Sequence, residues 1–192
     1  MDILILGPQG SGKGTQAKRI AAEYGLAHVA TGDMFRAAVA AGTPLGRQVK
    51  PILESGQLVP DELTIGLMRD RLQAGDARDG FILDGFPRTM AQAEALDAML
   101  SEIGRGLDVV LELLIPVEIC VERMLGRARE EGRSDDTPEV IAARLEVYAR
   151  ETVPVVEHYR AHGTLVGLKA DRTVDEVFAT IQDTLEQVEA HR

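Results

Sequence analysis

A glycine-rich segment near the start of the chain limits the folds open to this sequence more than any other feature. It reads GPQGSGKGT over residues 7–15, follows the apolar run ILIL, and leads into a helical pattern. Because glycine has no Cβ atom, the backbone N–H groups of such a turn can point inward around an anion, and the amino end of the following helix adds positive potential. The segment therefore predicts a strand, a phosphate-binding loop and a helix in that order.

The spacing of the loop favours a nucleoside triphosphate as its ligand. Gly7-x4-Gly12-Lys13 fits the phosphate-binding pattern, in which the lysine reaches the β- and γ-phosphates and a hydroxyl, here that of Thr15, orients hydrated Mg²⁺. The dinucleotide pattern G-x-G-x-x-G fails, because Gly10 and Gly12 would require a third glycine where Thr15 stands. A purely structural turn would explain neither the lysine nor the hydroxyl.

Composition excludes several classes of protein. With 192 residues, 45% of them hydrophobic, the chain can build one good core. Its net charge of −10 argues against a broad nucleic-acid-binding surface, and its one cysteine, Cys120, excludes an internal disulfide or a cysteine-rich zinc site. The sequence has neither a membrane-spanning run nor a basic leader, so we expect a cytoplasmic protein without membrane or nucleic-acid partners.

Short aliphatic runs alternate with helical patterns, which indicates an α/β fold with a parallel sheet covered on both faces. The predicted strands cover residues 2–6, 27–31, 80–84, 108–115 and 164–168. Helices are predicted over residues 13–24, 43–56, 61–74, 89–103 and 117–131, with two more beginning at Thr137 and Thr173. Pro51 is expected to kink or split the second helix. Residues 31–59 hold more helix than a crossover needs and are interpreted as a small inserted domain.

Three further segments identify a family. TGDMFR (31–36), LDGFPRT (83–89) and GRSDD (132–136), together with the glycine loop, closely resemble adenylate kinase over essentially the whole chain. That family transfers the terminal phosphoryl group of Mg-ATP to AMP, giving two ADP. The resemblance implies a P-loop kinase with a five-stranded parallel sheet, in strand order 2-3-1-4-5, flanked by helices. It divides the chain into a core (1–30, 60–126 and 135–192), a helical domain that binds the nucleoside monophosphate (31–59) and a short lid (127–134).

The resemblance also implies which residues bind ATP. They are Gly10, Ser11, Gly12, Lys13, Gly14, Thr15, Arg127 and Ala170. Ala170 stands where many members have glycine beside the ATP base, and Gln9 where many have proline; a backbone carbonyl contact would survive an alanine of negative φ. Asp84 closes a predicted strand at the carboxyl edge of the sheet, where ligands of such sheets bind. Asp84 and Thr15 are expected to hold Mg²⁺ through its water molecules, and no zinc site is expected.

The AMP site implied by the resemblance comes from four parts of the chain. Its residues are Thr31, Arg36, Gln57, Leu58, Val59, Gly85, Phe86, Pro87, Arg88, Gln92, Arg133 and Arg144. Thr31 would contact the adenine region, Gln92 would pair with adenine, and Arg88 would bind the phosphate, for which a guanidinium is suited. Other roles stay open, because Thr31 and Asp33 could cap a helix and Thr89-x-x-Gln92 has capping-box spacing.

An arginine-rich stretch supplies the expected catalytic charge. By resemblance, the catalytic residues are Lys13, Arg88, Arg123, Arg133 and Arg144. Phosphoryl transfer requires little covalent chemistry from the protein, so positioning and charge stabilisation carry it. Asp135 and Asp136 match an acidic pair that orients the arginines, although they could instead cap the next helix. Only AREEG separates Arg127 from Arg133, which indicates a short lid without zinc.

Two other functions remain open at this point. A UMP/CMP kinase would share the short lid and most of the arginines, although Thr31 and Gln92 favour adenine. A catalytically silent nucleotide-sensing module would lack Lys13 or an arginine, and all of these are present. We expect ATP, AMP and ADP as ligands, Mg²⁺ as the cofactor, and a monomer. No general base is needed, because the attacking phosphate oxygen of AMP is already ionised at neutral pH.

Overall fold

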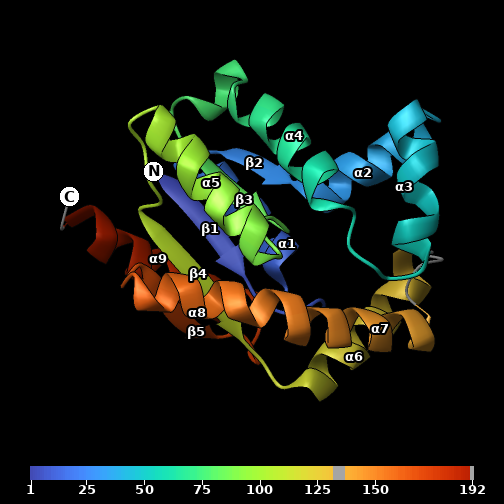
Figure 1. The fold of residues 1–192 in the computed structure, drawn as a ribbon. Helices are drawn as coiled ribbons and strands as arrows, with labels where there is room; N and C mark the ends of the chain where they lie inside the picture. Colours follow the sequence, from blue (N-terminus) through green and yellow to red (C-terminus); the bar gives the residue numbers. More distant parts are fainter. Residues whose placement is uncertain (132–136, 191–192) are drawn as a thin grey trace.

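A parallel sheet forms the centre of the protein (Figure 1). The structure, a computed structural model, describes residues 1–131 and 137–190. In this described part the strands are β1 (Asp2–Leu6), β2 (Ala27–Ala30), β3 (Phe81–Asp84), β4 (Val109–Leu114) and β5 (Leu165–Lys169). They are parallel and lie in the order β2-β3-β1-β4-β5, so the predicted fold class and strand order are confirmed.

Alternating side chains of the strands build a core on each face of the sheet. All five residues of β1 are buried. Leu4 and Leu6 join a cluster with α4 (Asp61–Leu72), α5 (Met90–Glu102) and α8 (Val153–Ala161), whereas Ile3 and Ile5 face α1 (Lys13–Tyr24) and α9 (Val174–Ala190). Figure 1 views the sheet from the side that α5 and α8 cover. Because both faces are covered, the strands are continuous apolar runs, as the sequence indicated.

Two helices pack on each other beside the sheet, within the range 31–59 that the sequence analysis interpreted as an insertion (Figure 1). They are α2 (Thr31–Ala40) and α3 (Pro44–Glu54), and they share a small core around Phe35, Val49 and Val59. A Cβ atom at Gly46 would lie 2.0 Å from the carbonyl oxygen of Ala38, so glycine allows this close approach. Of the two outcomes expected at Pro51, a kink or a split, the split does not occur, since α3 continues through this residue. Pro51 is exposed, and water can bind the carbonyl group that its missing N–H leaves unpaired.

Of the remaining elements, α6 (Val117–Glu131) and α7 (Pro138–Val147) agree with predicted helices. The short turns η1 (Gly75–Ala77) and η2 (Tyr148–Thr152), the second of them π-helical, were not predicted. Thr43, Thr137 and Thr173 cap the helices that they precede, each accepting a backbone N–H three residues further on. Among the described residues, no helix has both the length and the apolar character needed to cross a membrane.

Candidate active site

The glycine loop folds as a backbone cradle between β1 and α1. Gly7, Gly10 and Gly12 have φ angles of 147°, 84° and 95°, values that disfavour other residues. A Cβ atom at Gly10 would lie 2.4 Å from the carbonyl oxygen of Cys120, so the loop also needs this glycine to pack on α6. Among the described residues, no side chain caps the first turn of α1. Its N–H groups can therefore serve an anion.

Lys13 lies over this cradle. Its Nζ atom donates to the carbonyl oxygens of Gly7, at 2.6 Å, and Pro8, at 2.9 Å. Burial lowers the pKa of Lys13 to about 8; nearby Asp84 acts in the opposite direction, and Arg88 lowers the pKa further. The ammonium group is held by polar contacts that phosphate oxygens can replace.

Asp84 lies beside the loop at the carboxyl end of β3. It is aligned with Ile5 of β1 and Ala30 of β2, and a Cβ atom at Gly14 would be 3.4 Å from its Oδ2. Burial acts to raise the pKa of Asp84, but His28, Lys13 and Arg88 outweigh it and leave the pKa below its ordinary value. An ionised carboxylate next to a hydroxyl-bearing loop suits hydrated Mg²⁺, which prefers oxygen ligands.

Sequence reasoning did not identify His28 as a neighbour of Asp84. The Nε2 atom of His28 lies 3.9 Å from Asp84 Oδ2 and has no hydrogen-bond partner in the part of the chain that the structure describes. The two residues lie on adjacent strands, with His28 opposite Ile82. Only the pairing of β2 with β3 reveals this neighbour, and no local pattern marks it.

Arg88 is anchored at both its side chain and its backbone. Its Nε donates to the carbonyl oxygen of Gly85 at 2.7 Å, and its own carbonyl accepts from the hydroxyl of Thr152 at 2.9 Å. Burial lowers the pKa of Arg88; Asp84 acts against this, and Arg144 and Arg36 act with it. Neighbouring cations that repel one another in this way indicate a site prepared for an anion.

Thr31 does not cap α2, so that alternative is wrong. The helix begins at Thr31 itself, with Ala30 in the cap position, because β2 runs directly into α2. The hydroxyl of Thr31 instead donates to the carbonyl oxygen of Gly85 at 2.8 Å. Asp33 does not cap either, since it lies within the first helical turn and pairs with Arg36 at 2.6 Å.

One cleft of about 610 Å³ unites most of the predicted residues. All those predicted for ATP and Mg²⁺ line it: Gly10, Ser11, Gly12, Lys13, Gly14, Thr15, Asp84, Arg127 and Ala170. The cleft is also lined by five residues from the predicted AMP-binding and catalytic sets: Arg36, Gln57, Arg88, Arg123 and Arg144. Arg144 reaches the cleft where α7 meets the insertion, since a Cβ atom at Gly56 would be 3.2 Å from its Cγ. An arginine-lined cleft in a protein of net charge −10 is a local concentration of positive charge.

A smaller cavity of about 50 Å³ holds most of the remaining AMP-site residues. It is lined by Thr31, Leu58, Val59, Gly85 and Gln92, and it shares Gln57 and Arg88 with the large cleft. Phe86 lines neither cavity; its side chain is 0% exposed and packs in the core. Pro87 lines neither of them, and Arg133, Asp135 and Asp136 lie outside the described residues.

Arg123 makes contacts that its predicted role does not include. Its guanidinium donates to the carbonyl oxygens of Ser11, Ala170 and Arg172, at 3.3, 3.1 and 3.3 Å. It therefore ties the glycine loop to the segment between β5 and α9 while it lines the cleft.

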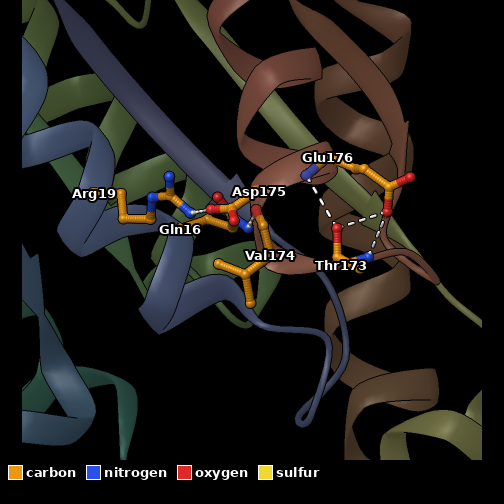
Figure 2. A network of polar contacts seen from close by, with 6 residues as sticks. All are labelled: Gln16, Arg19, Thr173, Val174, Asp175 and Glu176. Atoms are coloured by element: carbon orange, nitrogen blue, oxygen red, sulfur yellow. Dashed lines mark hydrogen bonds and ion pairs between the residues drawn. The ribbon is translucent and has the colours of Figure 1, made fainter.

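A polar network that the sequence showed only in part joins α1 to the start of α9 (Figure 2), and its residues Gln16, Thr173 and Val174 line the cleft. Gln16 Nε2 donates to the carbonyl oxygen of Val174 at 2.9 Å, and Arg19 pairs with Asp175 at 2.7 Å. The predicted capping box of Thr173 and Glu176 is confirmed by hydrogen bonds in both directions. The network fastens α1, which follows the loop, to the start of α9.

Comparisons with known proteins agree with this geometry. The sequence model described as "Adenylate kinase" matches residues 5–164. A protein named "Adenylate kinase" from Stenotrophomonas maltophilia is 48% identical over 181 residues, covering 94% of this chain and 97% of its own. Proteins of the same name from Methylorubrum populi and a Cyanothece species are 48% and 47% identical and cover 97% and 99% of this chain, and 96% and 97% of their own. The resemblance inferred from the motifs is confirmed: the chain belongs to the adenylate kinase family of ATP:AMP phosphotransferases.

Proposed function

We propose that the reversible transfer of a phosphoryl group from Mg-ATP to AMP, giving two ADP, takes place in the 610 Å³ cleft of this chain. The observation that carries this assignment is the convergence of Lys13, Asp84 and Arg88 on the backbone cradle of the glycine loop. Family membership supports the reaction and does not favour a UMP/CMP kinase or a silent nucleotide sensor.

On the ATP side, the loop from Gly10 to Thr15 binds the phosphates through backbone N–H groups. Lys13 exchanges its bonds to two loop carbonyls for bonds to β- and γ-phosphate oxygens. Arg127 adds charge, and the base lies against Ala170 and its neighbours at the start of α9. Asp84 and Thr15 would hold Mg²⁺ through its waters, and the ion, when bound, would neutralise charge on the phosphates.

On the AMP side, Arg36, Arg88 and Arg144 bind the phosphate, and the cavity beside Arg88 receives the base. An oxygen of the AMP phosphate attacks the γ-phosphorus in line with the departing ADP oxygen. No proton has to be removed, so the protein contributes position and charge. The backbone of Gly85 and the anchored Arg88 fix where the acceptor phosphate lies.

Three wider assignments belong to the same proposal. The core comprises residues 1–30, 60–126 and 135–192, the insertion of 31–59 closes over AMP, and 127–134 is a short lid that excludes water. Phe86, Pro87, Arg133, Asp135 and Asp136 keep their predicted roles as expectations, with Phe86 acting through its backbone because its side chain is buried. The enzyme acts as a monomer in the cytoplasm.

The test is a coupled assay that scans AMP, CMP and UMP as acceptors with and without Mg²⁺. We expect AMP to be the preferred acceptor and turnover to require Mg²⁺. The Lys13→Met variant controls for contaminating kinase, and Lys50→Met, which changes an exposed lysine of α3, controls for the loss of one charge. A preference for a pyrimidine would refute the assigned acceptor, and nucleotide binding without turnover would identify a silent module.

A further inference from the structure

We propose that Asp61 is a positioning residue that sets base specificity, because it holds the Gln92 amide in the one orientation that accepts a 6-amino purine. This inference rests on the proposed function and adds a determinant to its acceptor site. Gln92 is 2% exposed and lines the small cavity beside Arg88, together with apolar Phe35 and Val59. Thr31, Gln57 and Thr64 also line this cavity, and a base whose phosphate is held by Arg88 would meet the Gln92 amide there.

Two hydrogen-bond partners, one that can only donate and one that can only accept, determine the orientation of the Gln92 amide. Its Oε1 accepts the backbone N–H of Arg88 at 2.8 Å, and its Nε2 donates to Oδ1 of Asp61 at 2.8 Å. A backbone N–H can only donate and a carboxylate can only accept, so the oxygen and nitrogen of the amide cannot be exchanged. One N–H group and one oxygen lone pair of Gln92 remain for a ligand.

The carboxylate of Asp61 is itself fixed by the ends of two helices. Asp61 is the first residue of α4, where the helix dipole favours negative charge. The same Oδ1 atom accepts the hydroxyl of Thr89 at 3.0 Å, and the Thr89 oxygen caps α5 by accepting the N–H of Gln92 at 3.2 Å. Each of the three residues Asp61, Thr89 and Gln92 is therefore hydrogen-bonded to the other two, with Gln92 using both its side-chain amide and its backbone N–H.

The fixed amide distinguishes purines by the order of their donor and acceptor groups. A 6-amino purine presents an N6–H donor next to the N1 acceptor, whereas a 6-oxo purine presents the O6 acceptor next to an N1–H donor. Pairing with the second kind would require Gln92 to rotate its amide by half a turn. Its nitrogen would then face the Arg88 N–H, and its oxygen the Asp61 carboxylate, so both hydrogen bonds would become repulsive contacts.

The first measurement uses the unaltered enzyme and compares kcat/KM for AMP and for IMP, a 6-oxo analogue. We expect AMP to be favoured by at least about 100-fold, because a site built on specific hydrogen bonds rejects ligands that leave them unmet. Similar use of the two nucleotides would overturn the inference. Absence of turnover with AMP would instead refute the proposed function, so the two failures are distinguishable.

The second measurement uses Asp61→Asn, which keeps the shape but can present either a donor or an acceptor to Gln92. The AMP-to-IMP ratio of kcat/KM should fall at least about tenfold, with the KM for ATP unchanged. The matched control is Glu62→Gln, which removes a charge from the next, exposed position of the same helical turn and should leave the ratio unchanged. If Asp61→Asn lowers both activities equally, the residue only supports the fold and the inference is wrong. Asp61→Ser must lower the ratio too, which keeps the test decisive if the asparagine variant does not fold.

Discussion

The lowered pKa of Lys13 predicts that ATP binding weakens steeply as the pH rises from 7.5 to 9.5. Burial brings the pKa of this ammonium to about 8, so in the free enzyme its positive charge is present below that pH and lost above it. Bound phosphates favour the protonated form, so binding at high pH requires a proton to be taken up. The apparent Kd should therefore increase in inverse proportion to the fraction of free enzyme in which Lys13 is still protonated.

The size of the effect follows from the pKa alone. With a pKa of about 8, the factor 1 + 10^(pH − pKa) grows about 25-fold between pH 7.5 and 9.5, equivalent to ~2 kcal/mol of binding free energy. With the ordinary lysine value of 10.5, the same interval would change the Kd by only about 10%. Protonation of the nucleotide itself does not contribute to this change in Kd, because the last phosphate proton dissociates at about pH 6 to 7, below the interval measured.

The assay is calorimetric titration with a non-hydrolysable ATP analogue, since the chain has no tryptophan to report binding. Lys13→Arg is the matched control: it keeps every other titrating group and a charge that persists over the whole range. Its affinity should be lower because the guanidinium does not fit the loop, but its pH profile should be flat. A flat profile in the unaltered enzyme would show that the pKa of Lys13 is not lowered or that its charge does not contribute to binding.

The remaining predictions concern one residue of the site and one ion pair outside it. Arg88→Ala should raise the KM for AMP about 100-fold in steady-state assays and change the KM for ATP by less than about twofold. The reason is that the substitution removes charge-assisted hydrogen bonds to the acceptor only. An effect on the KM for ATP alone would mean that the ATP and AMP sites are exchanged. Arg105→Leu should lower the free energy of unfolding, measured in urea, by about 3–5 kcal/mol. Asp2 is only 6% exposed, and its Oδ2 accepts a hydrogen bond from Arg105 Nε at 2.8 Å. The substitution would leave this buried carboxylate without its guanidinium partner. The control Arg69→Leu, which breaks an exposed pair with Glu102 at 3.7 Å, should cost less than about 1 kcal/mol.

Features that depend on neighbouring residues in the sequence could be predicted. The loop around Lys13 needs only glycines, a lysine and a hydroxyl at fixed spacing, and the structure places Gly10, Gly12, Gly14, Lys13 and Thr15 in one cleft. The strands were recognisable because both faces of the sheet are covered, which makes each strand an apolar run. The caps at Thr43 and Thr173 were recognisable because a cap and the N–H that it accepts lie three residues apart.

Two alternatives that the sequence left open are wrong because the rest of the fold overrides a local preference. Threonine is a good N-cap, but β2 leads directly into α2, so Thr31 lies inside the helix and its hydroxyl turns to Gly85. Thr89 does cap α5, yet the side chain of Gln92 bonds to the N–H of Arg88, so the reciprocal bond of a capping box is not made. In both cases a partner brought in by the sheet or by an adjacent turn competes successfully with the local one.

The contacts that set the chemistry of the site could not have been predicted, because they join residues that only the tertiary fold brings together. Asp84 and Arg88 are both recognisable from their motif, but neighbours in other elements set the charge of one and the position of the other. His28 on β2 favours the ionised form of Asp84, and Thr152 of the π-helical turn holds the backbone of Arg88 in place. A π-helical turn at that position is itself typical of a functional site, since the extra residue redirects side chains. The motif therefore specifies which groups meet the phosphates, whereas the packing of β2 and η2 against the motif decides their charge and their position.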